Sequence, residues 1–208
     1  MFVRLLLSLC LLLPAACVFA EDSAATTPEN VVKQMIDDVL SSIRQDREIA
    51  LAPARMNELV GRKILPEIDF SRMTRQTVGS KYWNAVTEPE QQQLTDEFRT
   101  LLAHTFSNAL AQYTDQTVLF MPSRARPGAD EAMVRSIIMD PRDESTRLDF
   151  RLEKAGSGWL IYDLSIDGMS LIRIYRSNFG NELLQGGVTR LIGVLHKKNQ
   201  DAEIPMHS

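Results

Sequence analysis

The sequence predicts an α+β fold of amphipathic helices and an antiparallel twisted sheet of about four strands. Two observations support this prediction. Apolar residues recur at helical spacing near both ends of the chain, in the stretches 31–43, 94–113 and 172–195. Between residues 117 and 166, short apolar runs are separated by turn sequences, as in consecutive antiparallel strands. The order of helices, strands and helices favours N- and C-terminal helices that pack against the sheet.

Three helices are expected before residue 80. Thr27 is a suitable N-cap for the first helix, with Pro28 at its first position. A second helix is expected over residues 53–64. Asp69 should cap a third helix, which Gly79 ends. A short aromatic link, SKYWNAV, follows and is expected to be helical.

The strongest helix signal begins at Thr87, which is spaced to form a capping box with Glu90. One long apolar stripe then predicts a helix that is polar behind and apolar in front. The stripe consists of Leu94, Phe98, Leu101, Leu102, Phe106, Ala109, Leu110 and Tyr113.

Four strands are expected in TVLFM (117–121), AMVRSIIM (132–139), TRLDFRLEK (146–154) and GWLIYDLSI (158–166). In the third strand Leu148, Phe150 and Leu152 face one way and charged residues face the other. This alternation predicts a sheet with one covered face and one face in water. The fourth strand is apolar on both faces and is therefore expected to be central.

Helical spacing returns after Ser170, a plausible N-cap. Gly186 and Gly187 should end this helix, and a last helix should run to about Leu195. Residues 21–199 are expected to form a single domain, and residues 200–208 a polar tail.

The first 20 residues have the features of a secretory signal peptide. Arg4 precedes an apolar run that is too short to span a bilayer comfortably, and small residues suggest cleavage after Ala20. Cys17 leaves a lipoprotein alternative open, although Pro14 stands where such sites favour a branched aliphatic residue. Both cysteines lie in this segment, so the mature chain should have no disulfide or thiolate metal site.

The charge of the mature chain argues against a nucleic-acid partner. Without Arg4, 22 Lys and Arg residues stand against 27 Asp and Glu residues, a net charge of −5. Proteins that bind nucleic acid usually carry the opposite balance.

No group of residues supports catalysis, a metal or a cofactor. The chain has three histidines and no HExxH or GxSxG motif. Ser170 resembles a nucleophile position only superficially, because serine is common as an N-cap. Asp163 interrupts an apolar strand and, if buried, should have a hydrogen-bond or arginine partner. The aromatic residues fit a packed core or a lined cavity equally well, since periodicity does not separate the two.

Two segments carry a family resemblance. KILPEIDFSRMTRQTVGSKYWNAVTEPEQQQLTDEF and WLIYDLSIDGMSLIRIYRSNF resemble the MlaC, or toluene-tolerance, family of periplasmic phospholipid-binding proteins. The resemblance extends from about Val31 to Leu195. It departs from the family at Arg173 and Ile174, where two small hydrophilic residues often precede YR.

The resemblance implies an apolar cavity between the sheet and the helices that takes the acyl chains of a phospholipid. Residues on the inner faces would then line it, namely Tyr82, Trp83, Phe98, Leu102, Phe106, Tyr113, Phe120, Phe150, Tyr162, Leu164, Ile166, Ile172 and Tyr175. Four arginines are candidates for the phosphate of the headgroup, because guanidinium groups match phosphate geometry. These are Arg124, Arg126, Arg173 and Arg176.

The implied function is a periplasmic carrier that maintains the lipid asymmetry of the outer membrane. Its partners would be an inner-membrane ABC-type lipid transporter complex and an outer-membrane lipoprotein–porin complex, with glycerophospholipid as cargo. Two alternatives remain: a periplasmic adaptor or chaperone with a packed core and protein clients, and a lipid hydrolase that uses Ser170 and His104.

Overall fold

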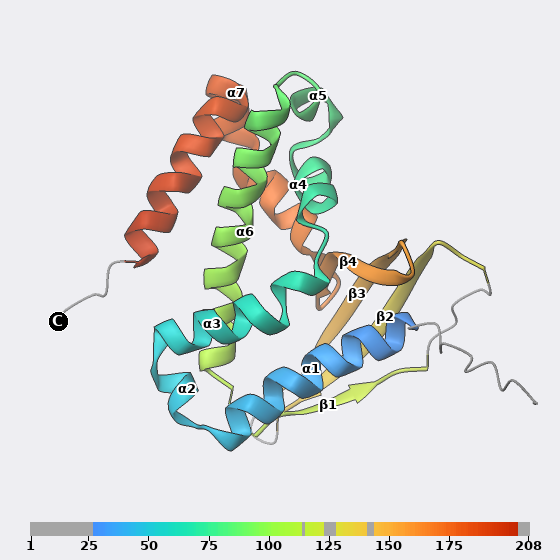
Figure 1. Ribbon diagram of the computed structural model, residues 1–208. Helices are drawn as coiled ribbons and strands as arrows, with labels where there is room; N and C mark the ends of the chain where they lie inside the picture. Colours follow the sequence, from blue (N-terminus) through green and yellow to red (C-terminus); the bar gives the residue numbers. More distant parts are fainter. Residues whose placement is uncertain (1–26, 114, 123–127, 141–143, 204–208) are drawn as a thin grey trace, which may run out of the picture.

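Helices cover one face of a five-stranded antiparallel sheet in the computed structural model of the chain (Figure 1). The structure describes residues 27–113, 115–122, 128–140 and 144–203, so the expected signal peptide lies outside it. The predicted α+β fold class is confirmed. Within the described segments, no helix has the length and apolar character needed to cross a membrane.

The helices of the first half begin at the predicted caps. The hydroxyl of Thr27 accepts a hydrogen bond from the N–H of Asn30 (3.2 Å), and the carboxylate of Asp69 accepts one from the N–H of Arg72 (2.8 Å). The short helices α2 and η1 were not predicted. The elements are α1 (Pro28–Gln45), α2 (Glu48–Leu51), α3 (Pro53–Lys63), η1 (Leu65–Glu67), α4 (Phe70–Val78), α5 (Ser80–Trp83) and α6 (Glu88–Ala111).

The five strands form a meander in which each strand pairs with the next one along the chain. The first four agree with the prediction, and the fifth is a two-residue strand at the edge. It forms because a turn at Asp167 and Gly168, both with positive φ (48° and 82°), folds Met169 back onto Ile166. The strands are β1 (Thr117–Phe120), β2 (Glu131–Met139), β3 (Thr146–Ala155), β4 (Gly158–Ile166) and β5 (Met169–Ser170).

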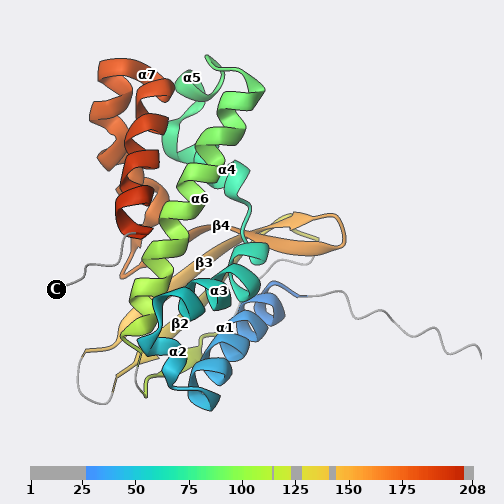
Figure 2. The same cartoon turned by 60° about the vertical axis from the view of Figure 1, so that its left-hand side comes forward.

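The last helix, α7 (Leu171–Glu203), is interrupted where the glycine pair predicts an end. Gly186 and Gly187 have non-helical backbone angles, and φ of Gly187 is +64°. The chain therefore turns and continues as a second helical segment packed beside α6 (Figure 2). This segment reaches Glu203, four residues into the stretch predicted to be a polar tail.

The sheet has an inner face, which α1, α3 and α6 cover, and an outer face on the opposite side (Figure 2). Side chains alternate between the two faces along each strand. On β1 to β4 the inner face carries Val118, Ile138, Leu148, Phe150 and Leu164, and the outer face carries Leu119, Ile137, Arg147, Asp149 and Ser165.

Arg72 attaches α4 to the sheet. Its guanidinium contacts the carboxylates of Glu131 and Glu153 and lies 3.7 Å from the ring centroid of Tyr162. The hydrogen bond from Arg72 lowers the pKa of Glu131, whereas burial raises the pKa of Glu153. This contact fixes the start of α4 against β2, β3 and β4.

Candidate functional site

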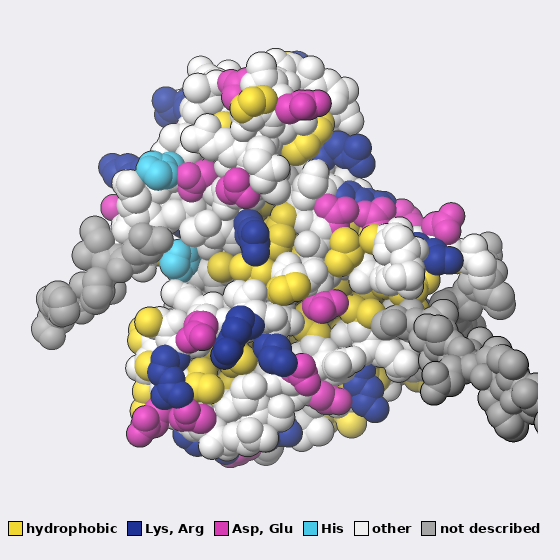
Figure 3. Space-filling model, in the orientation of Figure 1, with side chains coloured by type: hydrophobic (Ala, Val, Ile, Leu, Met, Phe, Trp, Pro, Cys, Tyr) yellow, Lys and Arg dark blue, Asp and Glu magenta, His cyan; other side chains and the backbone are white. Residues whose placement is uncertain are grey.

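A pocket of about 590 Å³ lies between the inner face of the sheet and the helices α1 and α6. Pockets for small molecules usually measure about 300–1,000 Å³, so its size is that of a ligand site. Apolar side chains also reach the surface in the middle of the view in Figure 3, between the upper helices and the helices α1 and α3. This pocket is therefore a candidate site for an apolar ligand.

Most of the pocket wall is hydrocarbon. Helix α1 contributes four apolar side chains from one stripe. The inner face of β1, β2, β3 and β4 contributes others. The apolar wall consists of Met35, Ile36, Val39, Leu40, Ile64, Ile68, Met73, Phe106, Ala109, Leu110, Val118, Ile138, Leu148, Phe150, Ile161, Leu164, Ile166 and Leu171. Such a wall offers dispersion contacts and few hydrogen bonds, and it suits an aliphatic ligand.

Polar residues gather at one end of the pocket, where α6 ends, β1 begins and β2 passes into β3. Gln112, Gln116, Asp140 and Glu144 line this end. The amide of Gln116 donates to the carboxylate of Asp140 (2.7 Å). The pocket is therefore amphipathic: most of its wall is apolar, and one end is polar.

Tyr113 connects this polar end to helix α1. Its hydroxyl accepts hydrogen bonds from Nη2 and Nε of Arg44 (2.8 and 3.1 Å) and donates to the carbonyl of Gln116 (3.0 Å). Arg44 also lies 5.9 Å from the centroid of the Tyr113 ring. A guanidinium group is thus held beside the polar end by a residue of the pocket wall.

Five of the thirteen residues predicted to line a cavity are in this wall: Phe106, Tyr113, Phe150, Leu164 and Ile166. They come from α6, β3 and β4, so the structure brings together residues that are up to 60 positions apart. Their contact with a ligand stays a prediction.

The other eight are not part of this wall. Phe98 and Tyr175 pack edge to face at 5.0 Å, and both contact Phe179 in a cluster between α6 and α7. Tyr162 lies against Arg72. The remaining five pack in or against the main core: Tyr82, Trp83, Leu102, Phe120 and Ile172.

The two predicted phosphate partners that the structure describes, Arg173 and Arg176, are not in the pocket wall. Arg124 and Arg126 lie outside the described residues. Arg173 is exposed near the start of α7, where its N–H donates to the hydroxyl of Ser170 (3.3 Å). Arg176 donates to the backbone carbonyl of Gln76. The described part of the pocket wall contains no lysine or arginine.

Two groups stand out among the wall residues that were missed from the sequence. The first is the apolar stripe of α1, which was predicted as a helix face but not as a cavity wall. Its outer member Ile36 is only partly buried and packs at the edge of the core, and a sequence does not reveal such incomplete burial. The second is the polar end, whose residues come from turns that looked like ordinary solvated loops.

Ser170 and Asp163 form a structural contact. The hydroxyl of Ser170 donates to Asp163 (2.7 Å), and the same carboxylate accepts the N–H of Ile172 (3.3 Å). Asp163 is only 2% exposed, so the hydrogen bonds satisfy a buried carboxylate at the start of α7. The hydroxyl of Ser170 also accepts the N–H of Arg173, so Ser170 is the N-cap of α7, as predicted.

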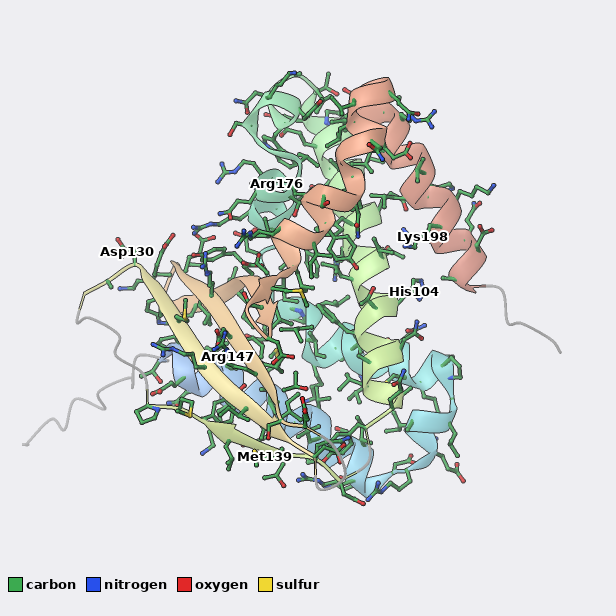
Figure 4. All side chains as sticks on the ribbon, turned by 180° about the vertical axis from the view of Figure 1, so that it is seen from behind. His104, Asp130, Met139, Arg147, Arg176 and Lys198 are labelled. Atoms are coloured by element: carbon green, nitrogen blue, oxygen red, sulfur yellow. The ribbon has the colours of Figure 1, made fainter. Side chains whose placement is uncertain are left out.

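His104 lies on α6 and has a buried Nε2 atom without a hydrogen-bond partner among the described residues. The structure gives no contact between His104 and Ser170, and Figure 4 shows His104 in the middle of α6. Among the residues that the structure describes, no group of His, Asp and Glu side chains has an arrangement that could hold a metal ion.

Comparisons with known proteins agree on one family. The family model described as "MlaC protein" matches residues 33–197. The chain is 22% identical over 165 residues to the toluene tolerance protein Ttg2D of Pseudomonas putida, a match that covers 79% of this chain and 76% of the relative.

A solved structure is similar as well. A phospholipid-binding protein from Ralstonia solanacearum, determined in complex with a phospholipid at 1.53 Å, superposes with a TM-score of 0.77. It is 35% identical, and the match covers 84% of this chain and 97% of that chain.

Proposed function

The chain belongs to the MlaC family, and on this basis we propose that it carries a glycerophospholipid with its acyl chains in the pocket beneath the sheet. The observation that carries this proposal is the apolar pocket of about 590 Å³ with a single polar end. The phospholipid bound by the similar protein of Ralstonia solanacearum supports the same ligand class.

The magnitudes explain why a lipid needs such a carrier. At about 0.8 kcal/mol per methylene, one sixteen-carbon chain in water costs on the order of 12 kcal/mol. A phospholipid with two chains would cost more than about 20 kcal/mol, so free diffusion across an aqueous space is negligible. A hydrocarbon wall cancels most of this cost and makes transfer from a bilayer nearly balanced.

We expect the headgroup at the polar end of the pocket. Gln112, Gln116, Asp140 and Glu144 offer hydrogen-bonding groups there, and Arg44 brings a guanidinium group to the same end through Tyr113. Arg44 therefore joins Arg124, Arg126, Arg173 and Arg176 as a candidate for the phosphate, and it is hydrogen-bonded to a residue of the pocket wall.

The proposed place of action is the periplasm, after cleavage of the N-terminal signal peptide. The family supports this location, and the carrier would exchange lipid with an outer-membrane lipoprotein–porin complex and an inner-membrane ABC-type transporter complex. Binding and release of cargo require no covalent bond to be broken. The proposed role is therefore transport without catalysis or cofactor.

The test is the lipid content of the protein purified from cells. Native mass spectrometry should show a mass increase equal to one phospholipid, and organic extraction should identify it. Protein that is always empty and takes up no lipid from vesicles would contradict the carrier and favour the adaptor with a packed core. Release of fatty acid that stops in a Ser170→Ala/His104→Ala variant would instead support a hydrolase.

A further inference from the structure

Helix α4 and the first segment of α7 form a surface that has several cations and no carboxylate of its own. Residues 70–86 and 170–181 contain five lysines and arginines and no Asp or Glu, on a chain whose net charge is −4. The two helices pack together, and Arg176 donates to the backbone carbonyl of Gln76 where α7 meets α4 (Figure 4). We call the exposed part of this surface the basic face. Its cations are Arg75, Arg173 and Arg176.

Carboxylates of the neighbouring elements do not cancel the charge of the basic face. Asp163, below the start of α7, is only 2% exposed, and Glu182 forms an ion pair with Arg190 (2.6 Å). On α6, Asp96 is offset by Arg99 one turn later. Among the described residues, no ion pair involves a cation of the basic face. On the adjoining outer face of the sheet, the four carboxylates that reach solvent are matched by four arginines: Glu131, Asp149, Glu153 and Asp167 beside Arg72, Arg135, Arg147 and Arg151.

Two large apolar side chains protrude at the ends of the basic face. Leu184 is 77% exposed and lies eleven residues after Arg173, a spacing that places both on one side of the uninterrupted helix. The helical rise separates them by about 16 Å. At the other end, Met169 is 61% exposed and lines a hollow together with Arg173. The basic face therefore has a cationic middle and an exposed apolar side chain at each end.

We propose that the basic face docks the protein on a bilayer whose surface contains anionic phospholipids. Guanidinium groups match lipid phosphates, while leucine and flexible methionine side chains can enter the boundary between headgroups and acyl chains. A stable protein interface has a continuous core that excludes water, whereas here the apolar side chains are separate and the arginines lie between them. A fluid bilayer contacts such separate groups without a matched shape. Because the rest of the chain is acidic, an anionic surface repels other orientations.

The basic face begins beside the pocket wall. Met169 pairs with Ile166 in the sheet, and both Ile166 and Leu171 line the pocket. A bilayer in contact with Met169 and Arg173 would therefore lie next to the pocket. The docking itself does not depend on the proposed cargo.

Sedimentation with vesicles tests this docking. The full mature chain should bind vesicles of phosphatidylcholine mixed with phosphatidylglycerol, bind phosphatidylcholine alone much less, and be released by salt. Arg75→Gln/Arg173→Gln should reduce the partition coefficient by about 30-fold, because each cation near an anionic surface contributes about fivefold. Met169→Ser/Leu184→Ser should weaken binding, and the binding that remains should keep its salt dependence.

Two controls match these variants. Lys197→Gln/Lys198→Gln removes the same charge from exposed positions on the last segment of α7, and Leu51→Ser removes a side chain that is 83% exposed on α2. Figure 4 shows Lys198 well away from Arg176. Both controls should bind vesicles as the wild type does.

Equal losses in the controls, equal binding to both kinds of vesicle, or basic-face variants that bind normally would each overturn the proposal. A wild-type chain that binds neither kind of vesicle would also overturn it and favour an acidic protein as the partner of this face. The lipid content of every variant is measured separately, so an empty protein that still docks would contradict the carrier function alone.

Discussion

Leu164 is the residue that best separates a hollow interior from a packed one. It lies on the inner face of β4, is half-buried and belongs to the pocket wall. Leu164→Trp should fill part of the pocket and oppose the ligand, which costs about 1–3 kcal/mol in overpacking, or about 5- to 150-fold in affinity for lipid. Native mass spectrometry of the purified variant should show mostly empty protein with an unchanged circular dichroism spectrum.

The control for this substitution is Ile137→Trp, which adds a similar side chain to the outer face of the same sheet. It should keep the lipid content of the wild type. A Leu164→Trp variant that retains full lipid content, or that loses lipid only because it unfolds, would count against the pocket as the binding site.

At the scale of single residues, the sequence predicted which side chains face the interior. It did not predict which of them pack in the core and which line the pocket. Periodicity placed Phe98, Phe106 and Leu164 on inward faces, and the structure agrees. Phe98 packs against Tyr175, whereas Phe106 lines the pocket. Periodicity did not distinguish the two because both belong to the same apolar stripe of α6. That difference depends on which element lies opposite, and only the tertiary arrangement decides it.

Helix α6 offers a prediction at the scale of a secondary-structure element. The N–H and the hydroxyl of Thr87 donate to the carboxylate of Glu90 (2.9 and 2.8 Å). These hydrogen bonds lower the pKa of Glu90 below its ordinary value of 4.5. The stability they provide is therefore complete above pH 4.5 and is lost as the pH falls through the lowered pKa.

Glu90→Ala should consequently lower the urea midpoint at pH 7, and the gap to the wild type should shrink at a pH below the lowered pKa. Glu88→Ala removes a carboxylate from the same first turn without touching the bond to Thr87 and should have a smaller effect. A gap for Glu90→Ala that stays constant across the acid range would show that the carboxylate is not the source of the stability.

The elements that were predicted correctly have strong local signals. Caps at Thr27, Asp69 and Ser170 and the break at Gly186 and Gly187 depend on a few neighbouring residues, and the strands are separated by clear turns. The four residues of α2 were missed because one helical turn has too few residues to show a period. The walls of the pocket were only partly predicted because they come from five different parts of the chain.

At the scale of the whole molecule, the arrangement of the layers produces the pocket. Helix α1 meets the inner face of the sheet near β2 and β4, and α6 closes another side. The buried contacts between α1 and α3, formed by Val39, Ile43, Met56 and Leu59, make a small core of their own. This small core packs α1 against α3, so the position of α1 does not depend on its contacts with the sheet alone.

A wall that is hydrocarbon on both sides gains dispersion contacts when an acyl chain enters, and the folded state is stabilised by any ligand it alone binds. Removal of lipid should therefore lower the melting temperature. At a lipid concentration about 100 times the dissociation constant the stabilisation is about 2.7 kcal/mol, which corresponds to about 5–10 °C for a chain of this size. Differential scanning calorimetry of purified protein and of solvent-extracted, refolded protein measures the shift. Adding back phospholipid should restore the higher melting temperature.

The control is the Leu164→Trp variant, which should melt at the same temperature before and after extraction because its pocket holds little lipid to lose. A wild-type protein that melts identically with and without lipid would mean that no cargo stabilises the interior.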